Sequence, residues 1–403
     1  MKINVLIIDQ ALDFGGSIVS TANLIRGLDS DKFNVIFCSS TNENLVKNKL
    51  REAANTTDVH ILKKGINYGN VERYLPYRNL ENAGLKGKLL KVLSYAARLI
   101  ANTPFMLKII YLVLTKNIHI IQINNGLDDE ICLVAKLLRK DLVSYFRGYT
   151  NMSNLQKKYF VRQFKYFFSV SEYTRQEAIA DGVPGERIIV ATPPAIPETI
   201  SNELIQSLNK QYRADKDTLF IGIFGRITPW KGQREFIEAA NIALASNKNI
   251  KFFIVGDVTD SSQAYFDQIQ QQITKLGIEN NIVFTGYIEN IYDYYELMDI
   301  VLHTSVEPEP SGRVIFEAMS QGKVVIASSL GGPKEFIEHN VDGFIIDPLD
   351  SPAIASTILE LASDPSKRSE FGERARKKME ALYNKNVYAK KISDYYTLTV
   401  SKK

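Results

Sequence analysis

Short apolar runs separated by amphipathic segments dominate the hydrophobic pattern of this chain. Each run is continuous rather than alternating, as expected for strands that are covered on both faces of a parallel sheet. Helical periodicity fills the intervals, for example at residues 128–139 and 171–181. The pattern predicts an α/β fold of doubly wound parallel sheets. The predicted strands are residues 3–8, 33–38, 119–123, 142–146, 166–170, 187–190, 219–224, 251–255, 282–284, 300–303, 324–326 and 343–346.

A proline cluster divides this alternation into two parts. Three prolines fall within five positions of residues 193–197, which stops any regular element and marks a linker. A chain of 403 residues also favours two cores over one. We therefore expect an N-terminal domain at 1–197, a C-terminal domain at 198–384, and a helix at 385–403 that packs back on the first domain. Two Rossmann-like domains whose sheets face a central cleft are the expected architecture.

Residues 84–116 form an unusual amphipathic segment. Seven apolar residues between 85 and 100 fall on one helical face, Lys86, Lys88, Lys91 and Arg98 are interspersed, and Pro104 opens a second apolar run. Such a basic amphipathic stretch can lie on an anionic membrane surface or accept a lipid-linked substrate. Ordinary helices packed on the sheet, with their lysines in solvent, are the simpler interpretation of this pattern. Neither run is long enough to span a bilayer.

Composition narrows the class of protein. Apolar residues make up 45% and charged residues 23%, as in ordinary soluble proteins. Residues 1–200 carry 26 basic and 18 acidic residues, whereas the remainder carries 23 and 27, so the first half is compatible with an anionic partner. The small net charge of +4 disfavours nucleic-acid binding. Two isolated cysteines and a first apolar run too short for a signal peptide predict a cytoplasmic protein.

The first predicted strand is followed by a glycine turn and a helix. Gly15 and Gly16 precede this helix, and such a turn can bring backbone amides close to a phosphate. The turn lacks the G-x-G-x-x-G spacing of dinucleotide-binding proteins, and a plain tight turn explains it equally well.

The strongest candidate for chemistry is the turn after the strand at 300–303. Glu309 and Glu317 bracket this strand-to-helix turn, which lies where parallel α/β sheets bind ligands. The amides of Gly312, Arg313 and Val314 would open the helix and offer N–H donors to a phosphate or a sugar oxygen.

A second loop, at residues 224–232, carries two cations. Arg226 and Lys231 follow the first strand of the second domain and could converge on one anion. A diphosphate without a metal held by the protein needs such compensation. The two glutamates about 80 residues later strengthen the interpretation of this basic pair as an anion-binding site.

Taken together, these motifs resemble the retaining GT-B glycosyltransferases, in particular family 4, the nucleotide-sugar transferases with an E-x7-E motif. The matching pieces are residues 225–226 and 231–232, residues 284–287, Glu309 with Glu317, and residues 331–337 leading to 342–343. The match is strong across 217–347 and looser elsewhere.

The resemblance implies a role for each matching position. Arg226 and Lys231 would bind the donor diphosphate, and Glu309 would bind the hydroxyls of the transferred sugar. Glu317 would hold the ribose. The other implied contacts with the donor are the amides of Gly312, Arg313 and Val314, the side chains of Tyr287 and Ile288 near the base, and Gly16 under the phosphate.

The implied reaction is a hexosyltransferase-type transfer from a nucleotide diphosphate sugar to an acceptor hydroxyl, with retention and without a metal or other cofactor. Retention in this family is described as a same-face displacement in which the departing phosphate helps to take the acceptor proton. The first domain departs from the family pattern because no histidine stands at residues 120–126 or 146–149. Asn124 or Arg147 could contribute there instead. His303 precedes the Glu309 loop but is more typical of a core residue.

The acceptor is expected to be a glycan or a lipid-linked molecule of surface polysaccharide, capsule, lipopolysaccharide or glycolipid assembly, with peripheral membrane contact through residues 84–116. This expectation rests on the amphipathic segment and on family analogy. A GT-B epimerase or phosphorylase and a non-catalytic sugar-nucleotide-binding scaffold are the alternatives.

Overall fold

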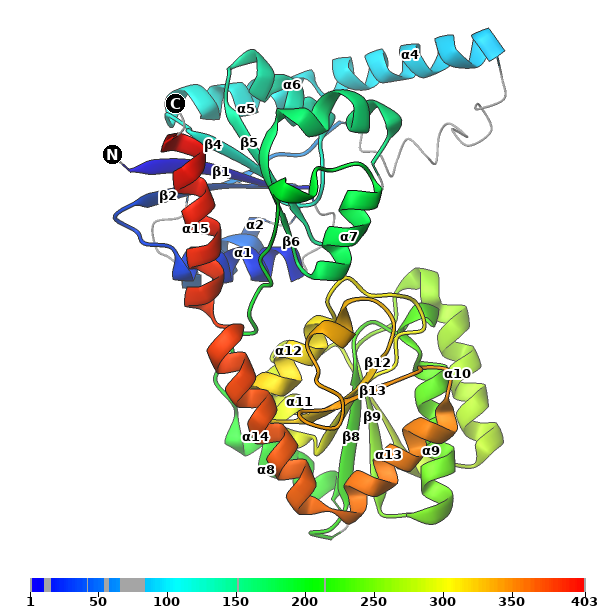
Figure 1. Ribbon diagram of the computed structural model, residues 1–403. Helices are drawn as coiled ribbons and strands as arrows, with labels where there is room; N and C mark the ends of the chain where they lie inside the picture. Colours follow the sequence, from blue (N-terminus) through cyan, green and yellow to red (C-terminus); the bar gives the residue numbers. More distant parts are fainter. Residues whose placement is uncertain are drawn as a thin grey trace. The chain divides into compact units, whose positions relative to one another are not determined.

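The computed structural model of the chain describes residues 2–10, 16–41, 43–53, 58–65, 84–150, 152–213 and 215–401. The chain folds into two compact units (Figure 1). Unit 1 comprises Met1–Val170, Thr174–Ala191 and Tyr388–Lys403, and unit 2 comprises Ser171–Tyr173 and Thr192–Val387. Each unit is built around its own parallel sheet.

Unit 1 contains a seven-stranded sheet in the order β3-β2-β1-β4-β5-β6-β7, and every neighbouring pair is parallel. The order runs outward in both directions from β1 and β4, as in doubly wound sheets. The strands are β1 (Ile3–Asp9), β2 (Phe33–Ser39), β3 (Asp58–Ile61), β4 (Ile120–Ile123), β5 (Asp141–Phe146), β6 (Phe164–Ser169) and β7 (Ile188–Val190). The helices are α1 (Gly16–Gly27), α2 (Glu43–Ala53), α4 (Gly84–Ala101), α5 (Thr103–Thr115), α6 (Asp129–Leu137), α7 (Glu172–Ala180) and α15 (Lys385–Ser401), with a π-helical turn at Gln156–Phe160.

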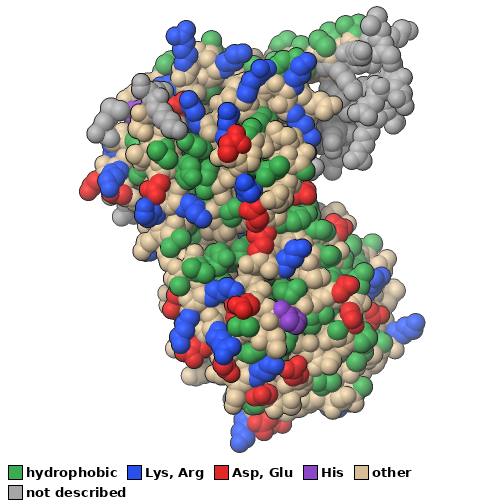
Figure 2. Space-filling model, in the orientation of Figure 1, with side chains coloured by type: hydrophobic (Ala, Val, Ile, Leu, Met, Phe, Trp, Pro, Cys, Tyr) green, Lys and Arg blue, Asp and Glu red, His purple; other side chains and the backbone are tan. Residues whose placement is uncertain are grey.

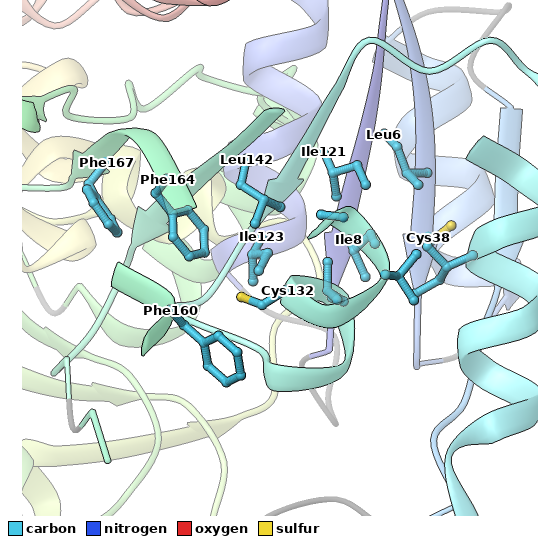
Figure 3. Packing of buried hydrophobic residues seen from close by; sticks show 14 of the residues in the cluster. Leu6, Ile8, Cys38, Ile121, Ile123, Cys132, Leu142, Phe160, Phe164 and Phe167 are labelled. Atoms are coloured by element: carbon cyan, nitrogen blue, oxygen red, sulfur yellow. The ribbon is translucent and has the colours of Figure 1, made fainter. Parts of the chain in front are cut away.

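Successive strand residues in unit 1 serve two separate cores. Leu6 and Ile8 pack with residues of α5 and α6, and Figure 3 shows Ile8 near Cys132 of α6 and Leu6 farther along the same cluster. Val5 and Ile7 belong to the opposite face, where they pack with residues of α1 and α15. Because side chains alternate along a strand, a continuous apolar run supplies both faces at once.

The C-terminal helix α15 is part of the second of these cores. Tyr388, Ile392 and Tyr396 are buried in it, and the Tyr396 hydroxyl donates a 2.5 Å hydrogen bond to Gln122 Oε1 on β4. The helix, red in Figure 1, lies against unit 1 although unit 2 precedes it in the chain.

Unit 2 contains a six-stranded parallel sheet in the order β10-β9-β8-β11-β12-β13. Helices α9, α10 and α13 cover one face, and α8, α11, α12 and α14 cover the other. The strands are β8 (Leu219–Phe224), β9 (Ile250–Val255), β10 (Ile282–Gly286), β11 (Ile300–His303), β12 (Val324–Ser328) and β13 (Phe344–Ile346). The helices are α8 (Asn202–Tyr212), α9 (Gln233–Ser246), α10 (Gln263–Leu276), α11 (Ile291–Leu297), α12 (Arg313–Ser320), α13 (Ser351–Ser363) and α14 (Pro365–Leu382).

The predicted fold class of two Rossmann-like α/β domains is confirmed. One strand was missed: β3 is a four-residue edge strand that contains Asp58 and His60, so it lacks the apolar run by which the others were found. The predicted helices within residues 84–116 form as α4 and α5, with Pro104 in the first turn of α5.

Candidate functional site

The sheet of unit 2 reverses its order between β8 and β11, and loops from both strands meet there. Such a switch point is where open α/β sheets bind their ligands. The β8 loop carries Arg226 and Lys231, and the β11 loop carries Glu309. The sequence therefore places its predicted site residues on the two loops that the topology favours.

Glu309 is the centre of this site. Its side chain is buried and accepts a hydrogen bond from Lys231 at Oε1. The Ser305 hydroxyl donates to the same oxygen over 2.8 Å, and His303 Nε2 lies 3.2 Å from Oε2. Three groups thus fix one carboxylate. His303 therefore belongs to the site, although a histidine in an apolar strand is more typical of a core residue. Its position just before the Glu309 loop was the only feature of the sequence that indicated a role in the site.

Burial alone would raise the pKa of the Glu309 carboxyl, because it disfavours the charged form. The neighbouring His303 and Lys231 outweigh this effect and hold the pKa well below its usual range. Glu309 is therefore ionised at neutral pH, and Lys231 balances its charge.

Glycines allow the backbone to close around Glu309. A Cβ on Gly232, whose φ is 74°, would lie 1.9 Å from the Thr304 carbonyl oxygen. A Cβ on Gly331, also at φ 74°, would lie 2.4 Å from the Glu309 carbonyl oxygen. Only glycine fits these two contacts, so the β8 loop and the segment after β12 both pack directly on the backbone of the β11 loop.

Glu317 is held in a second charged cluster on α12. Arg313, one turn earlier, donates to Glu317 Oε1 over 2.5 Å, and the buried Tyr295 hydroxyl donates to Oε2 over 2.9 Å. Tyr295 in turn stacks on Phe224 with ring centroids 4.1 Å apart. The sequence motif predicted Glu317 as a site residue. Its partner Tyr295 lies on α11, and no sequence pattern indicated that it would contact Glu317.

The N-terminus of α12 lies next to these clusters. Gly312 caps the helix in the left-handed conformation, with φ 70°, so the helix begins at Arg313. The Val314 amide in the first turn is among the donors that a helix leaves without internal partners, whereas the Ile315 amide donates to the Gly312 carbonyl oxygen over 2.9 Å. The Arg313 side chain does more than predicted, because it also fixes Glu317.

The remaining predicted residues of unit 2 are less closely tied to the site. Arg226 is exposed, and no hydrogen bond or ion pair of its guanidinium is found among the described residues. Tyr287 is 72% exposed and follows the edge strand β10. Ile288 packs partly against the core below α11. No described contact joins Tyr287 or Ile288 to Glu309.

Unit 1 carries its own polar cluster at the carboxyl edge of β1, β4 and β5. The buried Asn124 donates to Asp9 Oδ2 over 2.8 Å and to Thr21 Oγ1 over 3.0 Å. Its Oδ1 accepts from Arg147 Nε over 3.1 Å and from Nη2 over 3.0 Å. The structure thus brings the predicted Asn124 and Arg147 together. It adds Asp9, a fully buried residue that the sequence patterns did not single out.

Gly16 is the first residue of α1 in this unit, and Gly15 lies outside the described residues. Within the described part of the unit, its two histidines lie away from the polar cluster. His60 is on the edge strand β3, where its Nε2 is 3.1 Å from Asp58, and His119 precedes β4 at the amino end of the sheet.

Helices α4 and α5 expose a set of large apolar side chains, which we call the α4–α5 apolar surface. Their exposed fractions range from 51% to 74%, and Figure 2 shows hydrophobic side chains at the surface along α4. Helix α5 also buries side chains in the core, whereas Arg98 is the only side chain of α4 classed as buried among those described. The surface comprises Leu89, Leu90, Val92, Leu93, Ile100, Leu107, Tyr111 and Leu114.

Arg98 anchors α4 rather than facing solvent. Its Nη2 donates to Asp129 over 2.6 Å, and its Nε lies 3.1 Å from Glu130. In the described residues no single helix is long and apolar enough to cross a membrane; the segments Val92–Ala101 and Thr103–Thr115 reach that length and composition only as a pair bent by 55°. The side chains of Lys86, Lys88 and Lys91 lie outside the described part.

A metal site was not expected from the sequence. Among the described residues, no group of three or more His, Cys, Asp or Glu side chains lies in an arrangement that could hold a metal ion.

Residues 205–378 match the family described as Glycosyl transferases group 1. The chain is also similar to two curated relatives. N-acetyl-alpha-D-glucosaminyl L-malate synthase of Bacillus anthracis is 28% identical over 47% of this chain and 48% of that protein. Lipopolysaccharide 1,2-N-acetylglucosaminetransferase of Salmonella typhimurium is 26% identical over 49% of this chain and 55% of that protein. The chain therefore matches about half the length of these relatives.

Among solved structures, the chain resembles Anabaena Alr3699/HepE in complex with UDP and glucose. The TM-score is 0.77, the identity is 23%, and the match covers 98% of this chain and 100% of that one. This likeness shows the fold. With the family match, it confirms the predicted resemblance to GT-B glycosyltransferases.

Proposed function

Since the chain has the GT-B fold and residues 205–378 match the group 1 glycosyl transferases, we propose that it is a retaining hexosyltransferase. It would transfer a sugar from a nucleotide diphosphate sugar to an acceptor hydroxyl without a metal. The observation that carries this proposal is the fixed, ionised Glu309 beside Lys231 at the switch point of unit 2.

The geometry supports distinct roles for the two charged clusters. An ionised carboxylate held by Lys231 and Ser305 can accept hydrogen bonds from sugar hydroxyls without reorganising. Lys231 supplies the positive charge that a diphosphate needs as it binds and departs, and the exposed Arg226 can add a second. Glu317, oriented by Tyr295, is suited to the ribose hydroxyls.

Two features of unit 2 can stabilise the leaving diphosphate. The N-terminus of α12 favours negative charge through the dipole of the helix. Together with Lys231 it can stabilise charge on the departing phosphate, and that phosphate can take the acceptor proton in a same-face displacement. Glu309 then acts by positioning the sugar, and its contacts with Lys231 and His303 weaken it as a nucleophile.

The donor is proposed to be a UDP-sugar, because the similar Anabaena protein forms a complex with UDP and glucose. A thermal-shift screen with EDTA present throughout tests this. UDP and UDP-sugars should raise the melting temperature more than GDP, ADP or UMP, since a ligand that binds only the native state stabilises it. If no nucleotide shifts a folded sample, the protein would instead be a scaffold without a donor site.

Retention is tested separately, by the coupling constant of the anomeric proton in the product. An α-linked donor should give an α-linked product in EDTA. A β-linked product, or transfer that requires added metal, would overturn the proposed mechanism while leaving the donor site intact.

We further propose that the acceptor belongs to surface polysaccharide, lipopolysaccharide or glycolipid assembly and that the enzyme works on the cytoplasmic face of the membrane. The α4–α5 apolar surface supports this, because a solvated apolar face of this size is costly unless something covers it. Exposed Lys108 lies on α5, so an anionic lipid surface fits both the charge and the apolar side chains of this surface. The names of the relatives include a lipopolysaccharide transferase.

Cosedimentation with liposomes tests the membrane proposal. Changing Leu93, Ile100 and Leu107 to serine should abolish binding to anionic vesicles. Changing the equally exposed Leu349 and Leu382 of unit 2 to serine should leave it unchanged. Equal binding by both variants would contradict the proposal. The proposal would also be contradicted if the wild-type protein stayed in the supernatant as a dimer and only the first variant were a monomer.

A further inference from the structure

Arg147 in unit 1 carries a charge that no carboxylate neutralises directly. Its side chain is half-buried at the carboxyl end of β5, and no Asp or Glu of the described residues lies within ion-pair distance of it. Partly buried guanidinium groups usually meet a carboxylate, because desolvation of an unpaired charge is costly. This cation is therefore available for an anion.

The way Arg147 is held leaves one edge of its guanidinium open. Nε and Nη2 both donate to Asn124 Oδ1, so Asn124 occupies the edge of the guanidinium that Nε and Nη2 form. The guanidinium carbon lies 4.0 Å from the ring centroid of the buried Tyr145, which covers one face. Among the described residues, Nη1 has no hydrogen-bond partner. The Nη1–Nη2 edge keeps the planar fork that binds phosphate or carboxylate through two hydrogen bonds.

The partner of Arg147 is itself fixed. Asn124 uses both hydrogens of its amide on Asp9 and Thr21, which turns Oδ1 toward the guanidinium. Asn125 donates to the other oxygen of Asp9 over 3.1 Å. The chain Asp9–Asn124–Arg147 thus orients the cation, and the negative charge of Asp9 stays one residue away from it.

The surroundings point to a ligand as well. Strands β1, β4 and β5 are neighbours, and the order of the sheet reverses between β1 and β4. At this same edge, Gln10 follows β1 with both polar atoms of its amide buried and without a partner among the described residues. A Cβ on Gly148, next to Arg147, would meet no described atom within 4 Å. Buried amides without partners call for an explanation, and a polar ligand supplies one.

We propose that Arg147 binds an anionic group, a phosphate or a carboxylate, of the acceptor. The proposal deepens the proposed function and rests on it, because it assigns the acceptor to a chemical class. Asn124 and Asp9 are positioning residues for this subsite. An acceptor that offered only a neutral hydroxyl would not need the paired N–H donors of the guanidinium for binding.

The test measures binding of small anions by saturation-transfer NMR to the full chain. The protein carries R226A and K231M, so that the cations of unit 2 do not bind the probes. Glycerol 3-phosphate, succinate and neutral glycerol are the probes. At least one anion should bind and glycerol should not, and the anion that binds tells phosphate from carboxylate.

Adding R147M should weaken binding of that anion by about 10- to 100-fold, the usual effect of losing hydrogen bonds to a charged group. R147K keeps the charge without the fork and should weaken it less. The matched control is R162M, because Arg162 also lies over a tyrosine ring but is exposed before β6. R162M should change nothing.

Equal weakening by R147M and R162M, or no anion binding at all, would overturn the subsite. Should R147M fail to fold, unchanged binding by R147K and N124A together would overturn it equally. UDP binding by the wild-type chain is measured in parallel. If UDP fails to bind while the Arg147-dependent anion binds, the donor proposal fails and the subsite stands.

Discussion

The carboxyl edges of the two sheets are built in different ways. In unit 2, opposite charges meet directly, as Lys231 with Glu309 and Arg313 with Glu317. In unit 1, the amide of Asn124 separates the charges of Asp9 and Arg147. A directly paired carboxylate is neutralised and held in place before any ligand arrives, whereas a cation that an amide separates from the carboxylate stays available for a ligand. The difference agrees with the two proposals, that unit 2 binds the sugar and diphosphate of the donor and that unit 1 binds an anion.

The largest effect is expected when the unit 2 pair is broken. Glu309→Ala leaves Lys231 largely buried without its carboxylate, so the free energy of unfolding should fall by about 3–5 kcal/mol. Transfer should fall at least about a hundredfold. Urea unfolding and product formation measure the two effects. The double variant with Lys231→Met should recover stability but not transfer; recovery of both would show that Glu309 is only structural.

The same pair makes stability depend on pH. The folded-state pKa of Glu309 lies below its unfolded value, so its contribution is fully present above about pH 5 and is lost as the pH falls toward the folded pKa. Wild-type stability should therefore drop on acidification more steeply than that of Glu309→Gln. Parallel curves between pH 6 and pH 3 would contradict this.

A smaller effect is expected when the two loops of unit 2 are forced apart. Gly232→Ala adds a Cβ that would strike the Thr304 carbonyl, and it should cost about 2–4 kcal/mol of stability. Gly277→Ala is the matched control, since Gly277 has a similar φ of 66° but open space around it. Equal thermal destabilisation by both would mean that the close contact does not matter.

In unit 1 the corresponding change is Asn124→Ala. It removes the amide between Asp9 and Arg147 and should cost about 2–3 kcal/mol, because buried polar groups lose their partners. The exposed Asn125→Ala should cost less than about 1 kcal/mol. Chemical unfolding distinguishes them. A larger loss from Asn125→Ala would contradict the account of this edge.

The smallest effect tests the second cluster of unit 2. Tyr295→Phe removes one hydrogen bond to Glu317 and should cost about 1 kcal/mol. UDP affinity should fall severalfold, because Glu317 keeps Arg313 but loses its fixed orientation. Isothermal titration measures this; unchanged affinity would mean that Glu317 needs no help from Tyr295.

The two edges also differ in what the sequence could predict. Apolar runs and the spacing of Glu309 and Glu317 are local, so they predicted the strands and the paired carboxylates of unit 2. The contact between Asp9 and Asn124 joins residues 115 positions apart, and that between Tyr295 and Glu317 joins different helices. Such pairs depend on how strands and helices assemble. Local sequence patterns therefore predicted Asn124 and Glu317 as site residues but not their partners Asp9 and Tyr295.

The most direct test of the central claim is calorimetric titration of UDP in EDTA into the wild-type chain, Lys231→Met and the control Lys275→Met. Lys275 is exposed on α10, outside the switch point. We predict that UDP binds the wild type and the control alike and binds Lys231→Met about 10- to 100-fold more weakly. Equal affinity for all three folded proteins would contradict the assignment of this edge as the donor site.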